Sequence, residues 1–124
     1  MTSYGDGEAT ESGCLFCRII RGEVPSTGVL ATEHTYAFRD INPAMPVHVL
    51  VVPKRHIDNA GAVAAGDGAV LADVVMAARQ VAEAEGIAER GYRLVFNVGE
   101  DAQNSVGHLH LHVLGGRPMG WPPG

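Results

Sequence analysis

The stretch His108-Leu-His-Leu-His-Val-Leu114 alternates imidazole and aliphatic side chains. Successive side chains of a β-strand point to opposite faces, and residues two apart lie about 6.5–7 Å apart along one face. The alternation therefore predicts a strand over Val106–Leu114 with three imidazoles on one face and Leu109, Leu111 and Val113 on the other. The aliphatic face can pack on a helix, whereas the histidine face must meet solvent, a ligand or a metal.

The rest of the sequence predicts two helices and four more strands around this segment. The residues from Asp67 to Glu85 place apolar side chains at i, i+3, i+4 and i+7, which is typical of a long amphipathic helix. Asp67 can cap the start of this helix and Gly86 its end. The other predicted elements are a short helix at Cys14–Arg21, strands at Val29–Glu33 and Tyr36–Arg39 around a turn at His34–Thr35, a buried central strand at Val47–Pro53, and a strand at Tyr92–Asn97. This order favours an α+β domain with an antiparallel sheet.

Composition limits the classes of protein to which the chain can belong. Its 124 residues are 46% hydrophobic and 19% charged, which suits one packed domain, and we place that domain at residues 14–124. Residues 1–13 are rich in Gly, Ser, Thr and Glu, so we expect a disordered leader there. The net charge of −5 disfavours a nucleic-acid polymer as partner. Leaving out the leader's three acids gives 11 acids against 9 bases, a balance of only −2.

We expect a cytoplasmic protein that does not enter a membrane. The sequence contains no run of 18 apolar residues, so it predicts no membrane span. The first residues lack the basic and apolar regions of a signal peptide. Two cysteines, Cys14 and Cys17, are too few for a disulfide scaffold.

Two kinds of chemistry suit three histidines on one face. Three imidazoles can bind zinc, but alternate residues of one flat strand rarely converge on a single ion. A neutral imidazole is also a nucleophile and a general acid or base, suited to attack on phosphorus beside an imidazolium that stabilises charged oxygens. The sequence has no P-loop motif, its single lysine is Lys54, and it offers no tight acidic cluster for magnesium. Phosphoryl chemistry carried by histidines is the remaining interpretation.

The alternating stretch resembles the His-x-His-x-His-x-x signature of the histidine triad (HIT) superfamily. Four further segments are similar to its Hint branch, the nucleoside phosphoramidate hydrolases: Cys14-Leu-Phe-Cys-Arg-Ile-Ile20, Phe38-Arg-Asp-Ile-Asn-Pro43, His48-Val-Leu-Val-Val-Pro-Lys-Arg-His56 and Leu114-Gly-Gly-Arg-Pro-Met-Gly-Trp-Pro-Pro-Gly124. The resemblance covers about residues 14–124, and the Trp-Pro-Pro-Gly tail is its most branch-specific part. It implies a HIT-like fold with a five-stranded antiparallel sheet, one long and one short helix, and a two-fold homodimer with a ten-stranded sheet.

The resemblance also implies an activity, which is hydrolysis of the P–N bond that joins AMP or GMP to an amine, with no required cofactor. His110 would attack the α-phosphorus and carry a transient nucleotidyl group. His112 would contact the phosphate oxygens, while His108 and His48 would orient and polarise the nucleophile through hydrogen bonds. Ser105 would lie near the departing nitrogen.

Contacts to the purine nucleotide are implied in the same way. Asp40 would accept hydrogen bonds from the ribose 2′ and 3′ hydroxyls, which suits an ionised carboxylate because it has only acceptors. Asn97 would lie near the phosphate, and Trp121 would reach the active site of the neighbouring subunit. The apolar slot for the purine would be formed by Phe16, Ile19, Phe38 and Ile41.

The sequence departs from the family pattern at three places. Gly107 stands where the family often has a larger, commonly aromatic, side chain, and Gly120 stands where related tails can carry a bulkier residue. The loop Glu100–Asn104 differs from the glycine-rich loop common in the branch. The two glycines could widen the pocket or loosen the tail.

The spacing Cys14-x-x-Cys17 raises the question of a metal. A structural zinc site needs four ligands, and the resemblance points to His56 and His108 as the other two. Two buried thiols in a helix that bind no metal are the simpler interpretation, and the sequence alone favours it.

Two other functions stay open. One is a dinucleoside polyphosphate hydrolase from a neighbouring branch, against which the Trp-Pro-Pro-Gly tail speaks. The other is a nucleotide-binding or scaffold protein whose hydrolysis is incidental.

Overall fold

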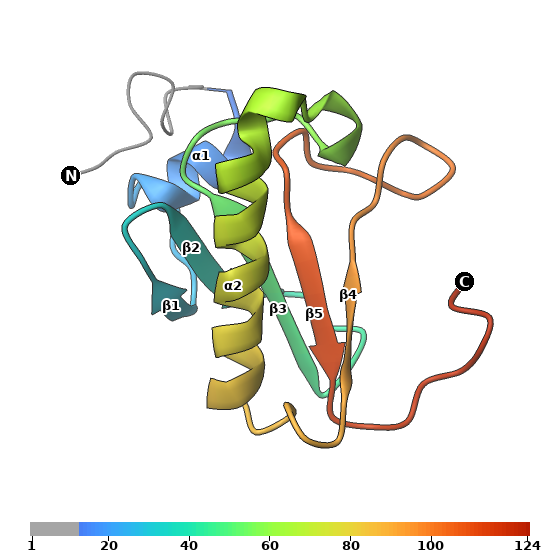
Figure 1. The fold of residues 1–124 in the computed structure, drawn as a ribbon. Helices are drawn as coiled ribbons and strands as arrows, with labels where there is room; N and C mark the ends of the chain where they lie inside the picture. The colour runs from blue at the N-terminus through green and yellow to red at the C-terminus, as the bar shows by residue number, and fades with distance from the viewer. Residues whose placement is uncertain (1–12) are drawn as a thin grey trace.

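An antiparallel sheet of five strands forms the centre of the structure, in the order β1-β2-β3-β5-β4 (Figure 1). The computed structural model describes residues 13–124, so the leader predicted for residues 1–13 lies outside the described residues except for Gly13. The strands are β1 (Gly28–Ala31), β2 (Thr35–Arg39), β3 (Val47–Pro53), β4 (Tyr92–Val95) and β5 (Leu111–Gly115). This order leaves β1 and β4 at the two edges.

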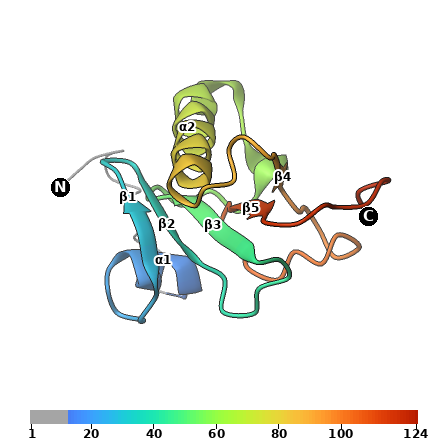
Figure 2. The ribbon, with the colours of Figure 1, turned by 90° about the horizontal axis from the view of Figure 1, so that it is seen from below.

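Two α-helices cover opposite faces of the sheet, as Figure 2 shows from below. They are α1 (Leu15–Ile20) on one face and α2 (Gly68–Ala84) on the other, with two short 3₁₀ turns, η1 (Ala60–Ala62) and η2 (Ala65–Asp67), ahead of α2. The predicted α+β class, with five antiparallel strands, one long helix and one short helix, is confirmed. Within residues 13–124, no helix has both the length and the apolar character needed to cross a bilayer.

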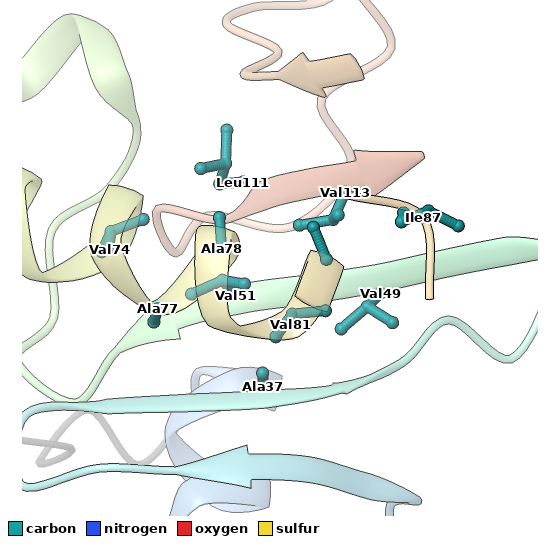
Figure 3. Packing of buried hydrophobic residues seen from close by; sticks show 11 residues of the cluster. Ala37, Val49, Val51, Val74, Ala77, Ala78, Val81, Ile87, Leu111 and Val113 are labelled. Carbon is teal, nitrogen blue, oxygen red and sulfur yellow. The ribbon is translucent and has the colours of Figure 1, made fainter. Parts of the chain in front are cut away.

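The main hydrophobic core lies between α2 and the sheet (Figure 3). Val74 and Val81 of the helix are fully buried there, together with Val113 of β5. Leu111 belongs to the same cluster, and Leu109 is buried in an adjoining cluster near the start of the helix. The aliphatic side chains of the alternating stretch therefore face the long helix, as predicted.

The ends of α2 agree with the sequence in position but not in every contact. Gly86 follows the helix at a φ of +76°, a left-handed conformation that glycine adopts without strain. Asp67 immediately precedes the helix, but its carboxylate does not cap the first turn. It accepts the N–H of Ala64 at 2.9 Å and pairs with Arg55 at 3.0 Å, which fixes the preceding 3₁₀ turn.

The last strand is shorter than the predicted strand Val106–Leu114, and that prediction was wrong at its start. The ladders to β3 and β4 reach no further than Leu111 and His112. Ahead of them, the N–H of Leu109 donates to the carbonyl of Ile57 at 2.6 Å instead of pairing with a strand. Two of the three histidines therefore lie on an irregular segment that leads into β5.

Two other strand ends also differ from the sequence prediction. The predicted strands Val29–Glu33 and Tyr92–Asn97 each end two residues earlier. The predicted turn at His34–Thr35 lies one residue earlier, because Thr35 already pairs with Pro53 in the ladder to β3.

Candidate functional site

A pocket of about 270 Å³ opens on the side of the sheet that carries α1. Its walls come from α1, from β2 and the turn after it, and from the segment that leads into β5. The pocket brings together nine of the predicted site residues: Phe16, Ile19, Phe38, Asp40, Ile41, Asn97, Ser105, His110 and His112. His48 and His108 are buried and do not line it.

The apolar part of the lining is suited to a flat ring. The rings of Phe16 and Phe38 meet edge to face with centroids 5.4 Å apart, and Ile19 packs beside them. Ile41 is 88% exposed, so its side chain stands at the open rim. Asp40 lines the same pocket and uses one oxygen, Oδ1, to accept the N–H of Asn42 at 2.8 Å.

His110 presents a ring nitrogen with a lone pair to this pocket. Its Nδ1 lies 2.7 Å from the main-chain oxygen of His108, and a carbonyl can only accept, so Nδ1 must carry the hydrogen. In the neutral ring, Nε2 then holds the lone pair. The ring of Phe16 meets the imidazole edge to face at 5.1 Å, which limits its rotation. His110 is therefore held in one tautomer, with a lone pair on Nε2 that is chemically able to act as a nucleophile.

The rings of His48 and His112 are in contact through their nitrogen atoms. The N–H of Ala44 donates to Nδ1 of His48 at 3.0 Å, so neutral His48 carries its hydrogen on Nε2. That Nε2 lies 2.9 Å from Nδ1 of His112 and 3.3 Å from a carboxylate oxygen of Asp40. Because Nδ1 of His112 accepts, its own hydrogen is on Nε2. The Asn97 amide group lies 3.3 Å from this Nε2 and can accept that hydrogen only with its oxygen turned towards His112, since the amide nitrogen is a donor. His112 thus offers an N–H donor within the pocket.

The charge state of His112 follows from its surroundings. Burial, with smaller contributions from the neighbouring His110 and His48, lowers its pKa to about 4, against the opposing effect of Asp40. At neutral pH His112 is therefore uncharged, and it can offer a hydrogen bond but not a positive charge. The imidazolium that the sequence interpretation placed beside the nucleophile is not found at this position.

A second cluster lies at the N-terminal end of α1. Nδ1 of His108 faces the Sγ atoms of Cys14 at 3.3 Å and Cys17 at 3.5 Å, and Nδ1 of His56 faces Cys17 Sγ at 3.5 Å. The four ligand atoms all lie within 4.8 Å of one another. The predicted zinc candidates Cys14, Cys17, His56 and His108 therefore do converge in space.

The geometry of this cluster fits a tetrahedral zinc ion. With Zn–S of about 2.3 Å and Zn–N of about 2.05 Å, a tetrahedral site places sulfur and nitrogen about 3.6 Å apart, close to the separations in the cluster. Nε2 of His56 donates to Asp58 at 2.8 Å and Nε2 of His108 donates to the Pro53 carbonyl at 2.9 Å, so both Nδ1 lone pairs point inward. Such outer hydrogen bonds are usual for metal-binding histidines.

One residue joins the two clusters. The side chain of His108 belongs to the cysteine cluster, whereas its main-chain oxygen holds the ring of His110. The pKa of His108 is lowered to about 4, because the effect of burial outweighs that of the hydrogen bond to Pro53, which raises the pKa. The contact that His108 makes with the His110 ring thus comes from a backbone atom and not from the imidazole.

One residue that lines the pocket was not indicated by the sequence. Gln103 also lines the pocket, and with a φ of 60° it is the single non-glycine residue with positive φ in residues 13–124. No sequence signal marks it, since nothing in a glutamine predicts this conformation. Trp121 is 83% exposed and does not line the pocket of its own chain. The tail before it is tied to β4 by Arg93, which donates to the carbonyl of Gly120 at 3.0 Å.

Comparison with known proteins gives consistent matches. The HIT domain family matches residues 21–119. The 14 kDa zinc-binding protein of Zea mays is 44% identical over 92% of this chain and 90% of its own length. A HIT family hydrolase from Legionella pneumophila Philadelphia 1 superposes with a TM-score of 0.88 at 49% identity, covering 90% of this chain and 100% of that one. A histidine triad nucleotide-binding protein from Candida albicans gives a TM-score of 0.76 at 31% identity, covering 89% and 83%.

Proposed function

The chain belongs to the HIT domain family, and from this membership and the pocket geometry we propose that it hydrolyses the P–N bond of purine nucleoside 5′-phosphoramidates. The superfamily that the sequence resembles is thereby confirmed, and relatives described as hydrolases support a hydrolase. The products would be AMP or GMP and an amine. This narrower activity is our proposal, and it depends above all on one observation.

That observation is the tautomer of His110. A hydrogen bond from Nδ1 to the His108 carbonyl leaves the Nε2 lone pair available in a pocket that also contains a neutral donor, His112. A neutral imidazole with a fixed lone pair is an effective nucleophile towards phosphorus. A lone pair aimed at a phosphate would weaken simple binding, so the arrangement suits nucleophilic attack better than binding alone.

The reaction would proceed in two displacements. First, Nε2 of His110 forms a bond to the α-phosphorus while the P–N bond breaks, and the amine takes up a proton from solvent as it leaves beside Ser105. Water then attacks the phosphorus, the bond to His110 breaks, and the nucleotide and a proton are released. The Nε2–H of His112 would donate to a phosphate oxygen as negative charge grows there. Asp40 would accept from the ribose, and the Phe16 slot would take the base.

An amine leaving group suits the charges of the pocket better than a polyphosphate. Arg39 is the single Lys or Arg side chain among the residues that line it, and its guanidinium forms two hydrogen bonds to Glu85, at 2.7 and 2.9 Å. A polyphosphate leaving group would place several negative charges where the lining residues offer no other Lys or Arg to compensate them. A departing amine needs only a proton.

A turnover assay tests the proposed activity. Adenosine 5′-phosphoramidate should be hydrolysed to AMP, and diadenosine tetraphosphate should be a much poorer substrate. His110→Ala should abolish turnover while AMP binding, measured by calorimetry, largely survives, because the variant removes the nucleophile and leaves the base and ribose contacts. Near-wild-type turnover by His110→Ala would refute the mechanism, and faster cleavage of the diadenosine compound would refute the substrate class.

We also propose that Cys14, Cys17, His56 and His108 hold a structural zinc ion. The support is the inward-facing set of two sulfurs and two Nδ1 atoms, together with the name of the maize relative. A four-ligand site has no open position for substrate, so the ion would supply a cross-link between α1 and the segment before β5. Metal analysis of the purified protein should give about one zinc per chain, and a metal-free yet equally stable protein would oppose the proposal.

A homodimer is the third part of the proposal. The outer edge of β4 has no partner strand among the described residues, and Leu94 and Val98 are exposed near it. Pairing of two β4 edges would give the ten-stranded sheet and bring Trp121 to the neighbouring site. Mixed His110→Ala and Trp121→Ala chains should recover activity that each lacks alone, because one composite site in the heterodimer is intact. No recovery after subunit exchange would contradict it.

A further inference from the structure

A second pocket of about 420 Å³ lies directly beside the nucleotide pocket. Leu15, Ser105 and Val106 line both pockets, so the two share an edge. The other residues that line the second pocket are Gly13, Cys14, His56 and Gly107. Any group attached to phosphorus that extends over Ser105 and Val106 would enter this space.

Gly107 lines this pocket and contributes no side chain to it. A Cβ at Gly107 would meet no heavy atom within 4 Å, so close packing does not require glycine there. The backbone does not require it either, because Gly107 is not among the glycines with positive φ. There is therefore room for a larger side chain at residue 107, on the edge of the second pocket.

The chemistry of the second pocket favours an uncharged ligand group. None of the residues that line it is Lys, Arg, Asp or Glu. Its imidazole, His56, already donates to Asp58, and Leu15 and Val106 supply apolar surface. A charged group would lose hydration here without gaining a counter-charge, which is costly. An aryl or alkyl group would lose little favourable hydration on entering the pocket.

We propose that this second pocket is the leaving-group subsite, and that it binds an uncharged aryl or alkyl substituent on the departing amine. The inference rests on the proposed phosphoramidase function, in which Ser105 lies beside the departing nitrogen. The inference adds to that function the chemical class of the departing amine. Gly107 is then the residue that determines how large the substituent can be.

Three AMP conjugates test this assignment. The first is adenosine 5′-phosphoramidate, whose amine has no substituent. The second carries 2-phenylethylamine, and the third carries phenylalanine, which differs from the second by one carboxylate. The wild-type protein should cleave the phenylethyl conjugate with a kcat/KM about tenfold or more above that of the phenylalanine conjugate, because only the latter places a charge in the pocket.

Filling the pocket supplies the decisive comparison. Gly107→Phe should lower kcat/KM for the phenylethyl conjugate by about tenfold or more and leave the unsubstituted phosphoramidate within about twofold of wild type. Gly107→Val should have an intermediate effect and serves as the milder variant. Gly66→Phe is the matched control, since Gly66 is exposed in η2 and a Cβ there would also meet no heavy atom within 4 Å. Zinc content and AMP affinity should be the same in all four proteins.

The outcomes separate this inference from the function on which it rests. If the wild-type protein cleaves the unsubstituted phosphoramidate but Gly107→Phe affects all three conjugates equally, or none, the subsite assignment is wrong and the function stands. If the wild-type protein cleaves no phosphoramidate, both are wrong. A preference for the phenylalanine conjugate would overturn the uncharged class.

Discussion

Lowering the pH from 7 to 5 should destabilise the metal-free protein through His108. The ring is fully buried, and burial lowers its pKa from 6.5 to about 4. In the unfolded chain the ring titrates near 6.5. Above pH 7 both states hold a neutral ring, so the full stability is present. Between pH 6.5 and about 4 only the unfolded state takes up the proton, and stability falls; below about pH 4 the loss levels off.

The two pKa values set the size of this effect. Protonation of His108 favours the unfolded chain by about 2 kcal/mol at pH 5 and by only about 0.2 kcal/mol at pH 7. His112 acts in the same direction, because burial also lowers its pKa to about 4. Its contribution is smaller, since the side chain is half-buried and water screens it.

Denaturant unfolding of the metal-free protein, followed by circular dichroism at pH 7, 6 and 5, measures this loss. The matched variant is His108→Asn, which removes the titrating ring and keeps an amide donor. Between pH 7 and 5 its free energy of unfolding should fall by about 2 kcal/mol less than that of the wild type. An equal fall in the two proteins would show that the buried ring does not govern the pH dependence.

Two further predictions concern the ribose contact and the core. Asp40→Asn should lower kcat/KM for adenosine 5′-phosphoramidate by about tenfold, which is the contribution of one charge-assisted hydrogen bond. For the 2′-deoxy substrate the decrease in kcat/KM should be smaller. An equal decrease with both substrates would show that the ribose does not contact Asp40. Val81→Ala should lower the free energy of unfolding by about 2 kcal/mol, because Val81 is fully buried between α2 and the sheet. Turnover at 25 °C should be unchanged. A decrease in the free energy of unfolding of less than about 0.5 kcal/mol would contradict this packing.

The sequence predicted the faces of the alternating stretch but not the length of its strand. The faces follow from the two-residue period of an extended chain, which needs no knowledge of neighbours. Whether residues 106–110 pair in a sheet depends on where β3 and β4 stop, and other segments of the chain decide that. The same reason explains why the predicted strand at Tyr92–Asn97 was too long.

The site could be predicted only in part for a similar reason. Residue types and the family resemblance indicated His110, His112 and Asp40 at the pocket. The spacing of Cys14 and Cys17 suggested a metal, but their approach to histidines 39 and 91 residues along the chain from Cys17 depends on the folded sheet. The tautomer of His110 depends on a backbone oxygen, which every residue possesses and no sequence pattern can reveal.

The hydrogen bond from His110 to a backbone oxygen also determines which substitutions the candidate site can tolerate. A substitution at residue 108 can remove an imidazole, and with it one ligand of the proposed zinc site, but it cannot remove the carbonyl that holds the His110 ring. The hydrogen bond is lost only if the main chain itself moves. In the course of evolution, the ligands of the proposed zinc site can therefore be gained or lost one at a time while His110 keeps its proton on Nδ1, provided that packing alone holds residues 108–110 in place.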